Sequence, residues 1–120
     1  MPAKIMVCDD AQLTRRTLKN ILENSGYQVI GEAVNGKDAV TKFRELKPDV
    51  VFMDIVMPEM DGIEAVRQIV SIDENVIIIM CSSLAQEKKV VTAVKAGARD
   101  FIVKPFTQER VLDAIQRYGI

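Results

Sequence analysis

Five short apolar segments alternate along the chain with five segments of helical periodicity. The apolar segments lie at residues 4–8, 28–33, 49–53, 76–81 and 101–103. The first has no internal polar alternation, which is typical of a strand covered on both faces. Such strict alternation predicts an α/β fold, in which a five-stranded parallel sheet has helices on both faces and right-handed crossovers.

Start and stop residues bound the helical segments. We expect the helices at residues 13–24, between Asn35 and Pro48, from Asp61 onward, at residues 86–96, and from Thr107 to about Tyr118. Asp61 and Glu64 resemble a capping box, and Thr107 is a predicted N-cap. In the fourth helix, the periodicity places Val90, Val91 and Val94 on one side.

The length of 120 residues fits one globular domain, and we expect no separate output domain. The net charge is -1, which argues against a general attraction to nucleic acid or to anionic membranes. The longest apolar run, residues 76–81, is far shorter than a membrane-spanning helix requires. We therefore expect a cytoplasmic protein without membrane insertion.

The chain has no histidine and only two cysteines, Cys8 and Cys81. Imidazole ligands and a phosphohistidine are therefore excluded, and carboxylates, lysines and hydroxyls remain for chemistry. Each cysteine ends an apolar segment, which favours a buried core thiol over a metal or redox role. If one strand separates them, the gap of about 9–10 Å is too wide for a disulfide, so we predict two free thiols.

Polar residues follow four of the five predicted strands. They are Asp9 and Asp10, Asp54, Ser82 and Lys104. Taken singly, each has a structural explanation, and Asp10 in particular also fits as the N-cap of the first helix. In open parallel sheets, however, ligands bind outside the carboxyl ends of the strands. The joint placement of these residues predicts one site at that edge.

Three nearby carboxylates repel one another unless a cation neutralises them. Oxygen ligands without His or Cys favour a hard cation, and Mg²⁺ is the natural candidate because it accepts few carboxylates and keeps several waters. A magnesium site beside Lys104 and Ser82 is suited to binding a phosphoryl group. Asp54 is then placed as a nucleophile that forms an aspartyl phosphate.

Four separated motifs together resemble the receiver domain of two-component response regulators. They are Asp9-Asp10, the DIVMPEMDG run that begins at Asp54, Ser82 after an apolar strand, and Lys104-Pro105-Phe106. The resemblance covers essentially the whole chain. Within the family, the sequence most resembles the single-domain regulators of the chemotaxis type. It implies the flavodoxin-like strand order 2-1-3-4-5 and a phosphoryl group received from a sensor histidine kinase.

The resemblance also implies a role for each site residue. Asp54 is expected to be the phosphoacceptor, and Mg²⁺ to be held by Asp10, Asp54 and the Val56 carbonyl. Asp9 is expected to act mainly through a bound water, and Lys104 to contact the phosphoryl group. The family further has a cis peptide bond at the position of Lys104-Pro105, which proline makes accessible.

Ser82 and Phe101 match the switch positions of the family. The Ser82 hydroxyl is expected to move toward the phosphate, and Phe101 to rotate inward after it. An output face on the fourth helix, fifth strand and fifth helix is expected to bind a downstream partner through Val90, Phe101 and Val103. Its predicted basic rim is Lys89, Lys95 and Arg110.

Two positions depart from many relatives, which carry polar residues near the path of the attacking water. Val56 and Leu84 are both apolar. We hypothesise slow self-dephosphorylation. The segment at residues 83–88 is also less typical of chemotaxis regulators, which bears on the identity of the partner.

Several functions remain open at this stage. We prefer motor control in chemotaxis over a phosphorelay intermediate or a phosphate sink. The regulator is then expected to be a monomer that binds a flagellar motor switch and is a substrate of a phosphatase. A haloacid-dehalogenase-type phosphohydrolase would need a second Asp where Val56 stands. A flavin-binding module would need a phosphate-cradling loop where Asp9 and Asp10 stand.

Overall fold

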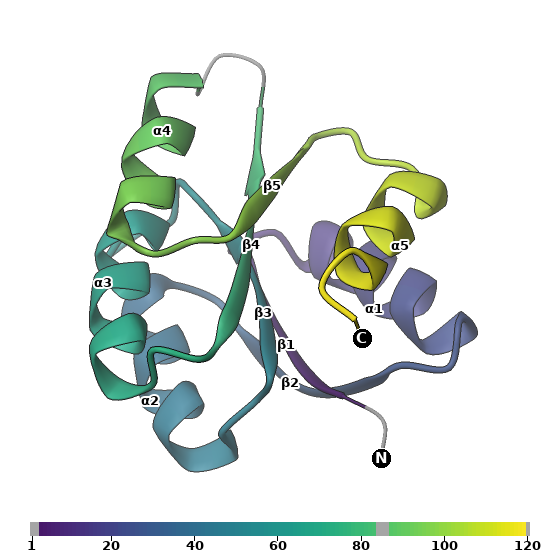
Figure 1. Cartoon of the computed structure of the whole chain (residues 1–120), viewed down its shortest axis with the longest axis horizontal. Coiled ribbons are helices and arrows are strands. Elements are labelled where there is room, and N and C mark those ends of the chain that lie inside the picture. The colour runs from purple at the N-terminus through teal and green to yellow at the C-terminus, as the bar shows by residue number, and fades with distance from the viewer. Residues whose placement is uncertain (1–2, 84–86, 120) are drawn as a thin grey trace.

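A five-stranded parallel sheet forms the centre of the molecule, with its strands in the order β2-β1-β3-β4-β5 (Figure 1). The structure is a computed structural model that describes residues 3–83 and 87–119. The strands are β1 (Lys4–Cys8), β2 (Gln28–Ala33), β3 (Val50–Asp54), β4 (Ile77–Ser82) and β5 (Asp100–Val103). The predicted α/β fold and the strand order implied by the resemblance are both confirmed.

Helices cover both faces of the sheet in two groups (Figure 1). The first group is α1 (Gln12–Asn24) and α5 (Gln108–Gln116), and the second is α2 (Gly36–Leu46), α3 (Gly62–Ile72) and α4 (Glu87–Ala96). In this described part of the chain, no helix combines the length and the apolar character needed to cross a membrane.

The inner strands supply two hydrophobic cores because their side chains alternate between the two faces. On β3, Val51 and Met53 join the core beneath α2, α3 and α4, whereas Val50 and Phe52 join the core beneath α1 and α5. All four of these side chains are fully buried. The continuous apolar sequence of the strand is therefore explained by burial on both faces.

β3 and β4 each extend one residue further than predicted, to Asp54 and Ser82. Asp54 pairs with Cys81, and Ser82 pairs with Val103, so the ladder continues through both polar residues. The two side chains are therefore held by the sheet itself rather than by the loops that follow it.

Three helices begin at side-chain caps. Asn35 accepts a hydrogen bond from Asp38 N at 2.7 Å, Asp61 from Glu64 N at 2.9 Å, and Thr107 from Arg110 N at 3.1 Å. These bonds satisfy backbone donors of the first helical turn. The predicted caps at Asp61 and Thr107 are confirmed.

The alternative role of Asp10 as a helix cap is wrong. The N-cap of α1 is Ala11, and no side chain caps this helix. Instead, Oδ1 of Asp9 accepts a hydrogen bond from Ala11 N at 2.8 Å. Asp10 is exposed, and its carboxylate is available to the site described below.

Gly62 allows α3 to start close against the end of β3. A Cβ atom at this position would lie 2.0 Å from the carbonyl oxygen of Asp54, so only glycine fits. The Gly62 N–H also donates to Ile55 O at 2.8 Å. The segment between β3 and α3 is thereby closed tightly around Asp54.

Cys8 and Cys81 are free and buried, as predicted. β3 lies between their strands, and the two thiols belong to different cores on opposite faces of the sheet. Burial raises the pKa of both thiols. Both are therefore inert core side chains at neutral pH.

Candidate functional site

Three carboxylates meet at the carboxyl edge of the sheet. Asp9 and Asp10 follow β1, and Asp54 ends the neighbouring strand β3. One carboxylate oxygen from each lies within 4.8 Å of the other two. Asp9 and Asp54 are only 2% and 6% exposed, whereas Asp10 is open to solvent. The cluster is therefore a half-buried acidic pocket with one accessible side.

Lys104 reaches into this pocket from the segment after β5. Its Nζ lies 2.8 Å from Oδ2 of Asp9 and 3.1 Å from Oδ1 of Asp54. Burial alone would lower the pKa of Lys104, but its hydrogen bonds and charge contacts with Asp9 and Asp54 outweigh this effect and raise it. The lysine is therefore firmly cationic, and it neutralises part of the acidic cluster.

The charge in the pocket is nevertheless not balanced. Burial and then the neighbouring Asp9 raise the pKa of Asp54, and the opposing effect of Lys104 does not cancel them. Three carboxylates face one ammonium group, with all available donors being oxygen atoms. This donor set fits a hard divalent cation such as Mg²⁺, which would supply the missing positive charge.

Ser82 lines a pocket of about 360 Å³ together with residues of α4 and β5. The serine is buried, with 1% exposure, and its carbonyl accepts a hydrogen bond from Lys104 N at 2.6 Å. Phe101 lines the same pocket and is 38% exposed. The hydroxyl predicted as a switch and the aromatic ring thus border one continuous space.

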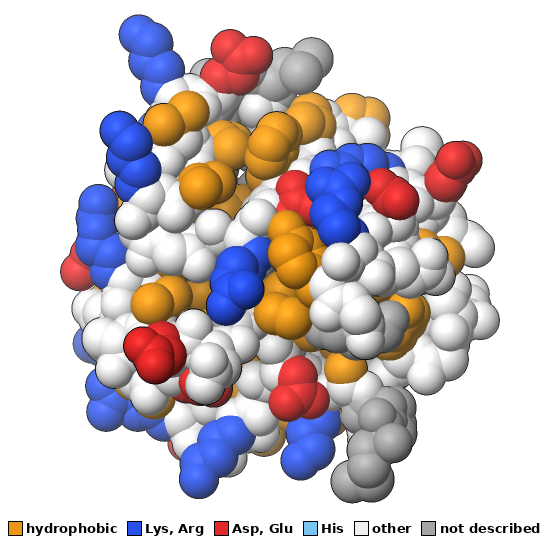
Figure 2. Space-filling view, viewed as in Figure 1, with side chains coloured by type: hydrophobic (Ala, Val, Ile, Leu, Met, Phe, Trp, Pro, Cys, Tyr) orange, Lys and Arg blue, Asp and Glu red, His pale blue; other side chains and the backbone are white. Residues whose placement is uncertain are grey.

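The expected apolar patch on α4 and β5 has different members from those predicted. Val90 is 8% exposed because it packs into the core beneath α4, so it lines the pocket from inside. Val91 and Val94, at 56% and 46%, are the exposed valines of the helix. Val103 is half-buried. Figure 2 shows hydrophobic side chains gathered between α4 and β5, with lysine and arginine side chains around them.

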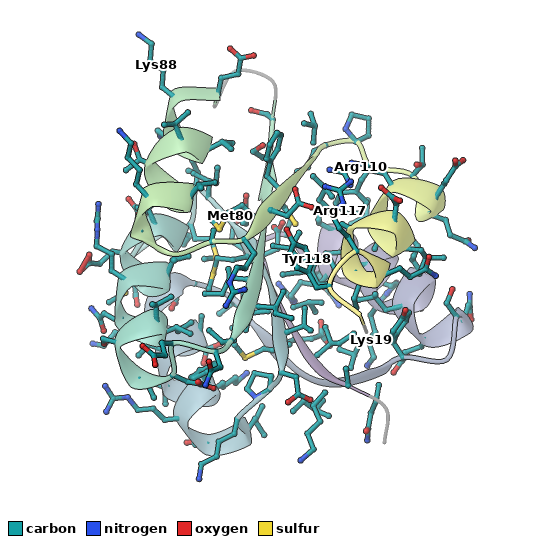
Figure 3. The ribbon with its side chains drawn as sticks, viewed as in Figure 1. Lys19, Met80, Lys88, Arg110, Arg117 and Tyr118 are labelled. Atoms are coloured by element: carbon teal, nitrogen blue, oxygen red, sulfur yellow. The ribbon has the colours of Figure 1, made fainter. Side chains whose placement is uncertain are left out.

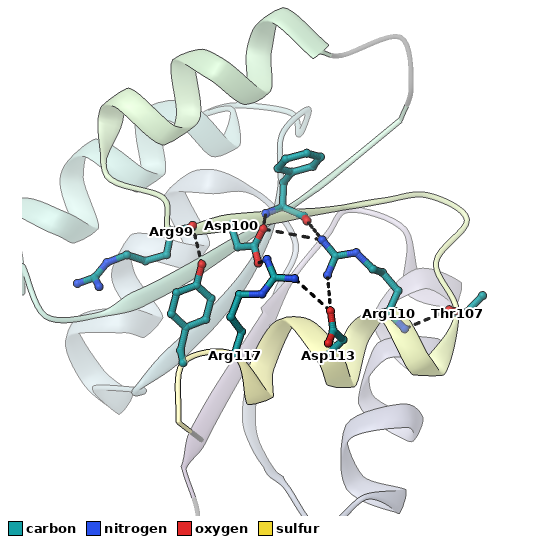
Figure 4. Close-up of polar contacts among 8 residues, drawn as sticks. Arg99, Asp100, Thr107, Arg110, Asp113 and Arg117 are labelled. Atoms are coloured by element: carbon teal, nitrogen blue, oxygen red, sulfur yellow. Dashed lines mark hydrogen bonds and ion pairs between the residues drawn. The ribbon is translucent and has the colours of Figure 1, made fainter.

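Arg110 in the first turn of α5 and Arg117 just after its last turn extend toward β5 (Figure 3). Arg117 donates to Oδ2 of the buried Asp100 at 3.0 Å, and Arg110 donates to the Phe101 carbonyl at 2.8 Å (Figure 4). Oδ1 of Asp100 in turn accepts from Phe101 N at 2.8 Å. Both backbone polar groups of Phe101 are therefore tied to this network, although its ring is exposed.

Arg15 lies next to the site and is not among the residues that the sequence predicted for it. Its Nη1 donates to the Asp9 carbonyl at 2.7 Å, and its Nε donates to Oε1 of Glu32 at 3.1 Å. The sequence signal would have been an arginine one turn into the helix that follows Asp9, since helical side chains lean toward the N-terminus.

The segment between β3 and α3 includes Val56, whose side chain is 45% exposed beside the site. The Lys104-Pro105 bond is cis, as the resemblance implies. Leu84 and Gln86, which entered the predictions of slow dephosphorylation and of the start of the fourth helix, lie outside the described residues.

The sequence comparisons identify the family. Residues 5–116 match the family described as response regulator receiver domain. The chemotaxis protein CheY of Thermotoga maritima is 51% identical over 117 residues, which are 98% of each chain. The chemotaxis protein CheY of Bacillus subtilis is 50% identical over the same length and share.

Solved structures agree with this assignment. A crystal structure of the CheX-CheY-BeF3-Mg+2 complex from Borrelia burgdorferi contains a chain with a TM-score of 0.94 and 34% identity, covering 100% of this chain and 91% of that one. The response regulator domain of Thermotoga maritima CheB gives a TM-score of 0.87 at 34% identity, covering 99% and 95%. The acidic pocket, the fold and these relatives agree. The chain belongs to the response regulator receiver domain family and is similar throughout its length to the chemotaxis regulator CheY.

Proposed function

We propose that this protein is a phosphorylated signalling switch whose phosphoacceptor is Asp54. The observation that carries the proposal is the convergence of two further carboxylates and one ammonium group on the end of β3. Asp54 ends β3, which lies in the sheet between β1, followed by Asp9 and Asp10, and β5, followed by Lys104. A nucleophilic carboxylate needs such surroundings to approach a negatively charged phosphoryl group.

In the proposed reaction, a sensor histidine kinase supplies the phosphoryl group as a phosphohistidine. An oxygen of Asp54 attacks the phosphorus atom, a P–O bond forms and the P–N bond breaks. The imidazole nitrogen keeps the electron pair of the broken bond, takes a proton from water, and the histidine leaves neutral. Asp10, Asp54 and the Val56 carbonyl would hold Mg²⁺, with Asp9 acting through a water molecule. When bound, the metal neutralises charge on the transferring phosphoryl oxygens.

Lys104 neutralises a further phosphoryl oxygen once its contact with Asp54 is replaced. The Ser82 O–H donates a hydrogen bond to the remaining phosphoryl oxygen, which draws the end of β4 toward the site. The pocket between Ser82 and Phe101 gives the aromatic ring room to turn inward. The chain thus promotes its own phosphorylation and dephosphorylation but acts on no separate substrate.

The proposed output is the control of a flagellar motor switch in chemotaxis, carried by a cytoplasmic, monomeric single-domain regulator. The similarity to chemotaxis proteins along nearly the whole chain supports this pathway. The proposed output face comprises the exposed Phe101, Val91 and Val94 and the half-buried Val103, and Val90 lines the pocket beneath them. A phosphatase partner is expected to act on the same phosphoryl group.

Incubation of the pure protein with a small acyl phosphate, followed by intact mass measurement, tests the phosphoacceptor. One added phosphate that requires Mg²⁺ and is absent in Asp54→Asn is expected. No adduct in the wild type would contradict the proposal. A phosphorylated protein that binds motor-switch peptide supports chemotaxis, whereas transfer onto a histidine of a second protein would favour the phosphorelay.

A further inference from the structure

The guanidinium group of Arg15 connects the acidic pocket to the edge strand β2. Nη1 donates to the carbonyl of Asp9 at 2.7 Å, and Nε donates to Oε1 of Glu32 at 3.1 Å. The Arg15 side chain is only 13% exposed. Two hydrogen bonds from one planar group fix its position and its orientation together.

Asp9 is held at each of its polar atoms. Its N–H donates to Ala33 O at 3.0 Å, Oδ1 accepts from Ala11 N at 2.8 Å, and Oδ2 accepts from Lys104 at 2.8 Å. Its carbonyl is held by Arg15. Among these partners, Arg15 is the one side chain that comes from a helix outside the acidic pocket.

The bond from Arg15 to the Asp9 carbonyl also constrains Asp10. The carbonyl of Asp9 and the N–H of Asp10 belong to one planar peptide unit, so fixing one orients the other. The following residue, Ala11, is an N-cap without a side-chain hydrogen bond, so the start of α1 is not fixed by a cap. Arg15 therefore controls the peptide from which both carboxylates project.

We propose that Arg15 is a positioning residue for the magnesium site, with Glu32 as the group that orients it. The inference rests on the proposed function, because it assumes that Asp9 and Asp10 serve a bound Mg²⁺. Residues that orient the ligands of a metal contribute to its affinity without touching it.

The charge of Arg15 acts in the opposite direction from its hydrogen bond. A cation beside the carboxylates repels Mg²⁺. Arg15 is also part of an ion-pair network: its Nε lies 3.1 Å from Oε1 of Glu32, and Nζ of Lys19 lies 3.8 Å from Oε2 of the same residue. If charge dominated, removal of Arg15 would tighten metal binding. If positioning dominates, the same removal weakens it.

Calorimetric titration of the metal-free protein with MgCl₂ separates these cases. Arg15→Ala is expected to weaken Mg²⁺ binding by about tenfold. Arg15→Lys keeps the charge but not the planar fork and is also expected to weaken binding severalfold. Arg16→Ala is the matched control: it removes the same charge from an exposed neighbour on α1 and should stay within about twofold of the wild type.

Glu32→Gln offers a second route if Arg15→Ala does not fold, because a neutral amide oxygen holds the Arg15 guanidinium group less strongly than a carboxylate does. Weaker Mg²⁺ binding is expected. Rates of phosphorylation by an acyl phosphate should recover in Arg15→Ala at saturating Mg²⁺. Wild-type or tighter Mg²⁺ binding in Arg15→Ala, or in both Arg15→Lys and Glu32→Gln, would overturn the inference. A wild-type protein that binds no Mg²⁺ would instead overturn the proposed function.

Discussion

The ammonium group of Lys104 lies 3.1 Å from Oδ1 of Asp54, and this contact joins the segment after β5 to the end of β3. The same ammonium lies 2.8 Å from Asp9, so a single cation is shared between two buried carboxylates. A metal ion held by Asp54 would therefore compete with the Lys104 ammonium group for the negative charge of the same carboxylate.

Lys104→Ala is expected to bind Mg²⁺ at least as tightly as the wild type, because the competing ammonium group is gone. Phosphorylation by an acyl phosphate should nevertheless slow by at least about tenfold, since Lys104 also stabilises charge on the transferring group. Calorimetry and time-resolved intact mass measure the two effects. Lys95→Ala, at an exposed lysine on α4, is the control and should leave both unchanged. An unchanged phosphorylation rate in Lys104→Ala would contradict the stabilising role of Lys104.

Asp54 is expected to make stability depend on pH in the absence of metal. Its pKa is raised above 3.8 in the folded state, so below 3.8 it is protonated in both states and incurs no penalty. As pH rises from 3.8 through the raised pKa, Asp54 ionises more readily in the unfolded chain than in the folded one, so the free energy of unfolding decreases. Asp54→Asn, which remains neutral, should therefore gain stability relative to the wild type over that range.

Urea unfolding at a series of pH values in chelator measures this difference. Added Mg²⁺ should reduce it, because a ligand that binds only the folded wild type stabilises it by mass action. A difference between Asp54→Asn and the wild type that does not change with pH would contradict the uncompensated charge at this position.

The exposed side chain of Val56 underlies a prediction about the lifetime of the phosphoryl group. An apolar residue beside the site is expected to hinder the approach of water, so Val56→Asn should shorten the lifetime severalfold. Loss of the phosphate is followed by intact mass after removal of the donor. Val91→Asn, at an exposed valine on α4, should leave the lifetime unchanged, and equal lifetimes in all three proteins would refute the hypothesis.

Arg117 is expected to stabilise the junction between α5 and β5. Arg117→Ala removes the 3.0 Å partner of the buried Asp100 and should lower the free energy of unfolding by about 1–2 kcal/mol. Arg99→Ala removes an equal charge from an exposed side chain and should change it by less than about 0.5 kcal/mol. Urea unfolding measures both free energies. Equal losses in Arg117→Ala and Arg99→Ala would contradict a stabilising contact between Arg117 and Asp100.

The sequence was sufficient to predict the fold and the convergence of the acidic site. The reason is geometric: parallel strands place their carboxyl ends at one edge, so Asp9, Asp54 and Lys104 meet whatever the details of the loops. The family assignment in turn removes the hydrolase alternative that the isolated residues had left open.

Two features were less predictable. Val90 and Val91 were expected on one side of a helix, but adjacent helical residues are about 100° apart, and only the packing of α4 decides which valine is buried. The role of Arg15 was missed because its partner is the backbone carbonyl of Asp9, which no side-chain type marks, and only the place of the arginine one turn into α1 pointed to the contact.

Chemical mapping of the phosphorylated residue shows directly whether Asp54 is the phosphoacceptor. The protein is phosphorylated with an acyl phosphate in Mg²⁺, treated with borohydride to reduce the acyl phosphate to homoserine, and digested for peptide mass spectrometry. Homoserine is expected at Asp54 alone, and at no position when Mg²⁺ is omitted. Homoserine at Asp9 or Asp10, or at no aspartate, would contradict Asp54 as the phosphoacceptor.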